Sequence, residues 1–360
     1  MHKADEIGLT KRLYFNDGHE GSTLFGGIMD IKNVLKNLCE ADYMGGVGNA
    51  LAVAEKYLSQ YATVRRSAYN VIGKMEGKSQ SAILLDAHID EIGMMVVAVT
   101  DDGFVKVTAS GGIDYRMLAG MKVKIYGKET VTGVFCSVPP HLRGGDKSVP
   151  KLDELYIDTG LSEKAKDVVS VGDRVMFKQT FQELQGDFVT AKALDDRAGV
   201  AVLLRVAEIL NGKELPRDVY FLFSDQEETT EAGAMTKTFE LGPEEAIVVD
   251  VTFGNAPDIA SDKAGVLGKG AMIGVSPSLD VNMCDSLKAV AKEKGILHQI
   301  EVMGRKTGTN ADVMASVGSG VKCSLVSVPL RNMHTPVEVV NTNDIESAAD
   351  IIAEYILSKM

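Results

Sequence analysis

The sequence of 360 residues contains no tryptophan, few cysteines and no block of basic residues. Its four cysteines, Cys39, Cys136, Cys284 and Cys323, share no short spacing, which argues against a zinc cluster and against a disulfide framework. Lys and Arg number 38 against 50 Asp and Glu, so the formal net charge is −12, and neither nucleic acid nor an anionic membrane is expected as a partner. No apolar run reaches the roughly 18 residues that a membrane helix needs.

The first 28 residues lack the apolar segment of a secretory signal. We predict that residues 1–28 are a poorly packed leader or extension, because a regular helical pattern begins only at Met29. Unpaired thiols are typical of a reducing compartment. The sequence therefore predicts a cytoplasmic protein.

Helices and strands are predicted to alternate along most of the chain. Hydrophobic residues make up 45% of the sequence, enough for a substantial core. Helical spacing of apolar residues alternates with short apolar runs that are typical of buried strands. The predicted helices are 49–61, 195–212, 282–295 and 343–360, and the predicted strands are 81–88, 218–225, 245–251 and 322–330. This pattern predicts an α/β fold with helices layered on a mostly parallel sheet.

Residues 96–187 have a different character. They are rich in Gly, Val, Lys and Thr, and they form short alternating segments separated by turn residues. We predict a small β-rich, barrel-like domain at 96–187, inserted into an α/β core that consists of residues 29–95 and 188–360.

Acids and histidines stand near the end of each predicted core strand, and an acidic pair opens the helix that follows the insertion. They are His88, Asp90, Glu227, Glu228, Asp250 and His334, with Asp195-Asp196 as the pair. In open α/β sheets, ligands bind beyond the carboxyl ends of the strands. Each residue alone is weak evidence, because strand ends are often solvated and an Asp before a helix is usually a cap. Their recurrence at corresponding places of one core predicts a common site.

Imidazole and carboxylate groups suit Zn²⁺, Co²⁺ or Mn²⁺. Without cations, so many carboxylates would repel one another and raise one another's pKa values. Successive side chains of an extended segment point in opposite directions, so one of Glu227 and Glu228 can bind a metal while the other faces the attacking water. Asp195, at a helix N-terminus, is well placed to bridge two cations.

In this order, the motifs resemble the dinuclear metallo-aminopeptidases that assemble as tetrahedral dodecamers. This is the TET or glutamyl aminopeptidase family, whose members are also labelled endoglucanase M or cellulase M. The resemblance covers about residues 29–360. The matching stretches are AHIDEIGMM (87–95), PHL (140–142), LDELYIDTG (152–160), AKALDDRAG (191–199), QEE (226–228), VDVT (249–252), LGKGAMI (267–273) and PLRNMHTPVE (329–338).

The resemblance implies a zinc-peptidase-like α/β/α core with two divalent metal ions per subunit, zinc or cobalt first and manganese as a further candidate. Carried over to this chain, it implies that His88 binds one ion together with Asp250, and that Asp195 bridges both ions. Glu228 and His334 would hold the second ion.

The resemblance also implies the catalytic roles. Glu227 would be the general base for a metal-bridging water, and Asp90 would orient His88. The substrates would be peptides that lose their N-terminal residues. The inserted domain would be the dimerisation domain through which twelve copies assemble.

Some stretches depart from the expected pattern. TTEAGA (229–234) follows the paired glutamates where Val-Gly and then Arg are expected, so Glu231 and Ala232 change the charge of the cleft. Asn310 stands where an Asp is expected, and residues 251–258 are irregular. None of these departures removes a predicted ligand, so they place the substrate preference in doubt.

Other functions fit the same residues. A metal-dependent deacylase of N-acyl amino acids would use the same core, and a metal-stabilised assembly protein without catalysis would keep only the ligands. A glycosidase fits less well, because glycosidases generally use two carboxylates without a metal pair, and a chain without Trp has no strong platform for stacking sugars.

Overall fold

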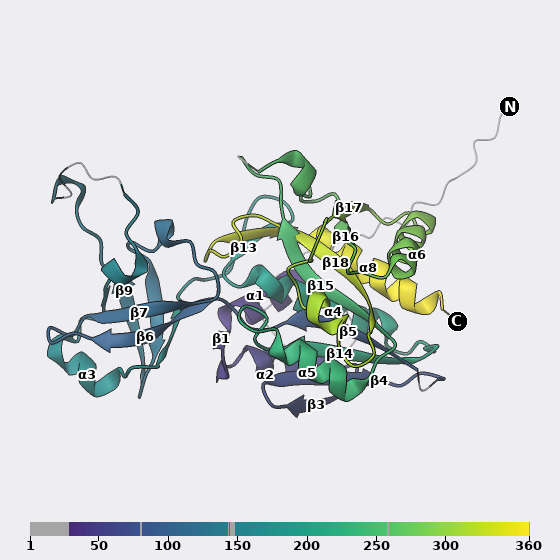
Figure 1. Ribbon diagram of the computed structural model, residues 1–360, viewed down its shortest axis with the longest axis horizontal. Coiled ribbons are helices and arrows are strands. Elements are labelled where there is room, and N and C mark those ends of the chain that lie inside the picture. Colours follow the sequence, from purple (N-terminus) through teal and green to yellow (C-terminus); the bar gives the residue numbers. More distant parts are fainter. Residues whose placement is uncertain (1–28, 80, 143, 145–147, 258, 360) are drawn as a thin grey trace, which may run out of the picture.

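An eight-stranded mixed sheet forms the centre of the larger part of the protein (Figure 1). The computed structural model describes residues 29–79, 81–142, 144, 148–257 and 259–359, so the predicted leader at 1–28 lies outside the described residues. The strand order is β17-β16-β18-β15-β5-β14-β4-β3. The strands are β3 (Thr63–Ser67), β4 (Asn70–Met75), β5 (Ala82–His88), β14 (Asp218–Ser224), β15 (Glu245–Phe253), β16 (Ala271–Val275), β17 (His298–Val302) and β18 (Lys322–Leu330).

The four strands predicted from apolar runs are the parallel centre of this sheet. β18, β15, β5 and β14 are neighbours, and each pair among them runs parallel. Such strands are buried on both faces, which explains their continuous apolar sequences. The flanking strands add antiparallel pairs, β14 with β4, β4 with β3, and β16 with β18, so the sheet is mixed.

Helices cover both faces of the sheet and complete the predicted α/β/α layers. On one face, α1 (Ile31–Glu40), α2 (Ala50–Leu58), α4 (Leu194–Leu210) and α8 (Thr342–Leu357) pack over side chains such as Leu85 and Val249. On the other face, α5 (Ala232–Leu241) and α7 (Ala311–Met314) pack over Leu84 and Val248. Helix α6 (Val281–Glu293) lies beside α8 and β16. Successive side chains of each strand point to opposite faces of the sheet, so every central strand contributes to an apolar layer on both faces.

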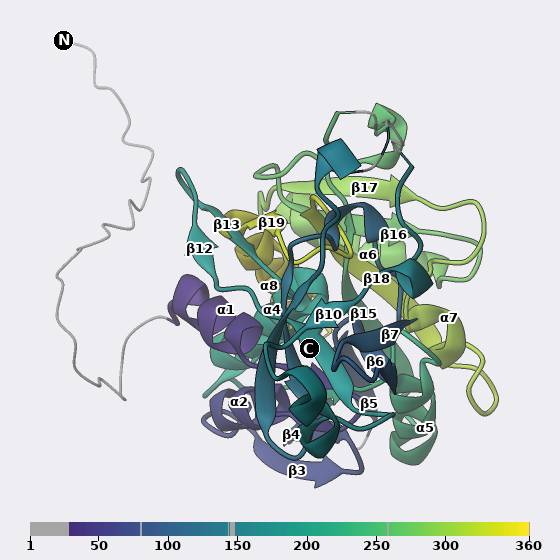
Figure 2. The same cartoon turned by 90° about the vertical axis from the view of Figure 1, so that its left-hand side faces the viewer.

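The inserted segment forms a closed six-stranded antiparallel barrel to one side of the core (Figures 1 and 2). Its own apolar core includes Val105, Ile125 and Phe177. The barrel strands are β6 (Gly93–Val99), β7 (Val105–Ser110), β8 (Lys122–Tyr126), β9 (Thr130–Phe135), β10 (Ile157–Asp158) and β11 (Arg174–Phe177). The barrel also carries the short helix α3 (Ala165–Val168). Closure of the barrel leaves no exposed strand edge. The apolar side chains inside the barrel form a core of their own.

Two small sheets complete the fold. The chain returns from the barrel to the core through β12 (Gln182–Glu183) and β13 (Phe188–Ala191). These two strands pair with each other, and β13 also pairs with β19 (Glu338–Asn341). A second hairpin, β1 (Tyr43–Met44) and β2 (Val47–Gly48), follows α1. Within the part of the chain that the structure describes, no helix has the length and apolarity to cross a membrane.

A buried polar cluster joins the barrel to the core. Asp42, which follows α1, accepts hydrogen bonds from Lys124 and Tyr126 of the barrel strand β8. Lys192, just after β13, lies 3.0 Å from the same carboxylate and also pairs with Glu91. Because Glu91 precedes the barrel and Lys192 follows it, this cluster fixes both connections between the two parts.

Candidate active site

The predicted site residues come together at the carboxyl edge of the parallel strands. His88 is the last residue of β5, and it pairs with Ser224 at the end of β14. Glu227 and Glu228 follow β14, while Asp250 lies near the end of β15. Parallel strands bring their carboxyl ends to one edge, which explains why residues far apart in the sequence meet there.

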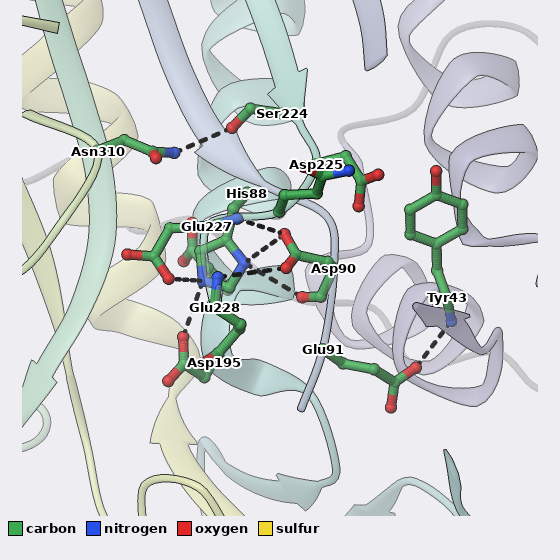
Figure 3. Close-up of polar contacts among 12 residues, drawn as sticks. Tyr43, His88, Asp90, Glu91, Asp195, Ser224, Asp225, Glu227, Glu228 and Asn310 are labelled. Carbon is green, nitrogen blue, oxygen red and sulfur yellow. Dashed lines mark hydrogen bonds and ion pairs between the residues drawn. The ribbon is translucent and has the colours of Figure 1, made fainter. Parts of the chain in front are cut away.

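Asp195 connects the two histidines. Its Oδ1 lies 3.0 Å from Nε2 of His88 (Figure 3). Its Oδ2 lies 3.4 Å from Nε2 of His334. Glu228 Oε2 is 3.5 Å from the same nitrogen of His334. The structure therefore brings His88, Asp195, Glu228 and His334 into one cluster, although the chain separates them widely.

Two groups of three residues, drawn from this cluster and from the acids beside it, have ligand atoms close enough together to hold a cation. In the first, His88, Asp195 and Glu228 offer atoms that all lie within 4.8 Å of one another. In the second, His88, Asp196 and Asp250 do the same. Asp196 was visible in the sequence as half of an acidic pair, but no role was predicted for it. Its carboxylate is fully buried, and Oδ2 has no hydrogen-bond partner.

Burial and mutual repulsion disfavour the charged form of several of these acids. Burial, with the nearby Asp195 charge, raises the pKa of Glu228 well above its ordinary value. Burial and the charge of Asp250 likewise raise the pKa of Asp196, and burial raises the pKa of Asp250. A bound cation would remove this repulsion.

The same carboxylates favour the charged form of the two histidines and so raise their pKa values. Burial opposes a charge on His88, yet the carboxylates of Asp195 and Asp90 raise its pKa well above the ordinary value. The Asp195 carboxylate, which accepts a hydrogen bond from the His334 ring, raises the pKa of His334, although burial opposes this shift. Divalent cations take the place of protons at such nitrogens, so cation binding is expected to release protons.

Glu227 differs from Glu228 because it lies outside both groups of closely spaced ligand atoms. Its Oε2 is 4.0 Å from Nε2 of His88. Burial raises the pKa of Glu227 to about 7; His88 lowers this value, and the charges of Asp195 and Asp90 add to it. A carboxylate that titrates near neutrality is suited to accept and return a proton.

Asp90 contacts both His88 and the paired glutamates (Figure 3). Its Oδ1 lies 3.5 Å from Nδ1 of His88, and its backbone oxygen lies 3.1 Å from that nitrogen. The Asp90 carboxylate also accepts hydrogen bonds from the backbone N–H groups of Glu227, at 3.1 Å, and Glu228, at 3.3 Å. Asp90 thus positions three residues, whereas the sequence predicts a contact with His88 alone.

Glu338 is a site residue that the sequence analysis did not single out. It is buried at the start of β19, where Oε2 accepts from the backbone N–H of Asp195 at 3.1 Å and Oε1 from that of His334 at 2.9 Å. One carboxylate therefore holds the backbones of two residues of the cluster. The only signal in the sequence was its position four residues after His334 in the PLRNMHTPVE stretch.

The structure accounts for Asn310, the residue that stands where an Asp was expected. Its Nδ2 donates to the buried Asp86 carboxylate at 2.8 Å and lies 3.0 Å from the hydroxyl of Ser224. Asp86 lies two residues before His88 on β5, with the same side-chain orientation. An amide at 310 can donate to this acid, whereas a carboxylate would repel it.

A family model described as M42 glutamyl aminopeptidase matches residues 69–351. The chain belongs to the M42 glutamyl aminopeptidase family. It is thus an aminopeptidase of a metallopeptidase family, which agrees with the resemblance seen in the sequence.

Individual relatives agree with this assignment along most of the M42 aminopeptidase chain. A lysyl aminopeptidase from Pyrococcus furiosus is 32% identical over 285 residues, 77% of this chain and 82% of that protein. The aminopeptidase APDkam598 from the archaeon Desulfurococcus kamchatkensis has a TM-score of 0.84 at 30% identity, covering 91% of this chain and 94% of its own. The TET1 peptidase of Pyrococcus horikoshii, which can assemble into a tetrahedron or a large octahedral shell, has a TM-score of 0.80 at 30% identity, covering 91% and 99%.

Proposed function

We propose that this M42 aminopeptidase uses two divalent cations to remove N-terminal residues from peptides. The observation that carries the proposal is the position of Asp195, whose two carboxylate oxygens face Nε2 of His88 at 3.0 Å and Nε2 of His334 at 3.4 Å. A carboxylate between two imidazoles, with further acids on either side, is the arrangement expected of a bridging ligand.

The described residues fit such a pair of cations. In the proposed arrangement, His88 and Asp250 would hold one ion, Glu228 and His334 would hold the other, and Asp195 would be shared between them. The neighbouring Asp196, buried with an unpartnered oxygen, offers a further donor on the side of Asp250. The donors are nitrogen and oxygen, which suit zinc, cobalt or manganese. Such cations polarise the scissile carbonyl and lower the pKa of water.

We assign proton transfer to Glu227. Its carboxylate takes a proton from the attacking water as the new C–O bond forms. It then passes this proton to the nitrogen of the departing amine as the peptide C–N bond breaks. The pKa of about 7 suits both steps, because the group can accept and release a proton near neutral pH. Asp90 keeps the backbone of Glu227 in place through its hydrogen bond.

We further propose that the inserted domain, predicted at residues 96–187, forms the assembly domain and that residues 29–95 and 188–360 form the catalytic part; the first barrel strand, β6, begins three residues before this predicted boundary, at Gly93. The barrel has its own closed core, and the related TET1 peptidase assembles into a tetrahedron or an octahedral shell. A dodecamer of this 38.6 kDa chain would have about twelve times that mass, and light scattering after size-exclusion chromatography would detect it.

The four free cysteines fit a cytoplasmic location.

The decisive experiment replaces Glu227 by Gln. We expect Glu227→Gln to keep two bound ions per chain while kcat falls about 100- to 10,000-fold, because the amide cannot transfer the proton. Glu244→Gln is the matched control, since Glu244 is an exposed glutamate distant from the cluster. Near-normal turnover by Glu227→Gln would contradict the assignment.

A substrate panel separates peptidase from deacylase activity. Aminoacyl anilides and short peptides with free N-termini are compared with N-acyl amino acids, for each of the metals added back to the metal-free enzyme. Hydrolysis confined to the acylated compounds would refute the aminopeptidase proposal for this chain.

A further inference from the structure

A turn of the inserted barrel lies against the proposed ligands of the second cation. The turn begins where β7 ends at Ser110 and continues through Gly111 and Gly112. Ser110 pairs with Gly93, the first residue of β6, so the turn lies next to the point where the chain enters the barrel. The barrel therefore reaches the site that the core strands build.

Gly112 lies where a side chain would meet the His334 ring. A Cβ added at Gly112 would be 2.7 Å from Nδ1 and 3.1 Å from Cε1 of His334. Real Cβ atoms essentially never come closer than 3.0 Å to a non-bonded atom, so the ring or the turn would have to move. The φ angle of Gly112 is outside the left-handed region, so its backbone does not itself require glycine. The neighbouring ring is the constraint on this position.

A movement of the His334 ring would disturb its contacts with the two acids. Its Nε2 faces Asp195 Oδ2 at 3.4 Å and Glu228 Oε2 at 3.5 Å, while Gly112 lies against Nδ1 and Cε1 of the same ring. Its backbone N–H is bound by Glu338 at 2.9 Å. A displacement of several tenths of an ångström at Nδ1 would turn Nε2 away from the two carboxylates.

Gly111 lies next to Glu228, the other proposed ligand of the second cation. A Cβ at Gly111 would lie 3.3 Å from Oε2 of Glu228, but also 2.8 Å from Cγ2 of Ile92, and its φ is +79°. A substitution at Gly111 would therefore combine backbone strain with two contacts. Gly112 offers the cleaner test, because only the ring opposes a side chain there.

We propose that Gly112 of the barrel is a positioning residue of the metal centre, which leaves the space that lets His334 turn Nε2 toward Asp195 and Glu228. The inserted domain is then part of the catalytic site in each subunit, in addition to its proposed role in assembly. This inference rests on the proposed function, in which His334 is a ligand of the second ion.

Zinc binding by Gly112→Ala tests the inference. Metal-free wild-type and variant proteins are equilibrated with graded free Zn²⁺, and bound zinc is counted by elemental analysis. We expect both proteins to bind the first ion equally, and Gly112→Ala to bind the second about 10- to 100-fold more weakly. Gly304→Ala is the matched control, because no atom lies within 4 Å of a Cβ at Gly304 and its φ is outside the left-handed region.

A double-mutant cycle with His334→Ala shows whether the effect passes through the ring. Without the ring there is no contact, so Gly112→Ala should change neither zinc binding nor the unfolding temperature in the His334→Ala background. Unchanged binding of the second ion by Gly112→Ala, equal weakening of both ions, or an equally large effect of Gly112→Ala without the ring would overturn the inference. Wild-type protein that binds fewer than two ions would instead refute the proposed function.

Discussion

The carboxylate of Asp90 accepts a hydrogen bond from the backbone N–H of Glu227 at 3.1 Å. A second bond, from the N–H of Glu228, makes Asp90 a support for the whole segment that carries the proposed base and one proposed ligand. The same side chain faces Nδ1 of His88 at 3.5 Å. An acid expected to orient one histidine therefore also fixes the loop opposite that histidine.

Replacing Asp90 by Asn should disturb both partners together. Asn has one acceptor oxygen where Asp has two, so its NH₂ group must face a backbone N–H or the His88 ring. We expect kcat/KM to fall about 10- to 100-fold and zinc affinity to fall by a similar factor. Steady-state kinetics and equilibrium dialysis measure these changes. The control is Asp158→Asn, which removes a carboxylate that caps the backbone of Gly160 in the barrel. Equal kinetics for both variants would contradict the role of Asp90.

Glu338→Gln should weaken zinc binding without removing a proposed ligand. The amide NH₂ must face the N–H of either Asp195 or His334, and this repulsion displaces one of them. We expect about 10- to 100-fold weaker zinc binding. Glu154→Gln serves as the control, since Glu154 also accepts from a backbone N–H but lies on the exposed surface of the barrel. Wild-type affinity in Glu338→Gln would show that the backbone contacts do not matter for the site.

Asn310→Asp should destabilise the protein, although an Asp is expected at this position from the family resemblance. The new carboxylate would face the buried Asp86 carboxylate across the present 2.8 Å hydrogen bond. We expect a loss of about 3 kcal/mol in the free energy of unfolding, growing as the pH rises and both acids ionise. Urea denaturation of the metal-free protein measures it. The exchanged pair, Asp86→Asn with Asn310→Asp, should recover at least half of the loss, and no recovery would exclude a direct coupling.

The stability of the metal-free protein should fall as the pH rises toward 7, in part because of Asp225. Burial, together with the Asp90 charge, raises the pKa of Asp225 from 3.8 to about 7. Between these values the native state holds a proton that the unfolded chain has released, so increasing pH favours unfolding. Asp225→Asn removes this dependence and should stabilise the protein at about pH 8, by at most a few kcal/mol, with little effect near pH 4.

Thermal unfolding of the metal-free proteins across this pH range is the measurement. Asp262→Asn, at an exposed position, should follow the wild-type curve. An Asp225→Asn curve parallel to that of the wild type would show that the carboxyl does not bind its proton differently in the folded and unfolded states.

The centre of the fold could be predicted because its sequence carries a strong signal. Strands β5, β14, β15 and β18 are continuous apolar runs, since helices cover both of their faces. The flanking strands carry weaker signals: β3 reads TVRRS and has no buried residue, and β17 reads HQIEV with exposed residues among half-buried ones. Strand pairing at a sheet edge depends on the neighbour more than on the strand's own composition.

The site was only partly readable from the sequence. Residues near strand ends, such as His88 and Asp250, could be brought together by reasoning, because parallel strands share an edge. Glu338 holds backbone groups of distant residues, and Gly112 acts through a missing side chain, so neither has a local signature. Their contributions become visible only when the tertiary contacts are known.

The order of the site along the chain also has a consequence for biosynthesis. His88 leaves the ribosome before the barrel is made, Asp195 follows 107 positions later, and His334 is made after both. A nascent polypeptide that ends before His334 does not hold the complete set of proposed donors. Under the proposed function, the chain must therefore be synthesised at least as far as His334 before both cations can be captured, so that metal loading follows the synthesis of the inserted barrel.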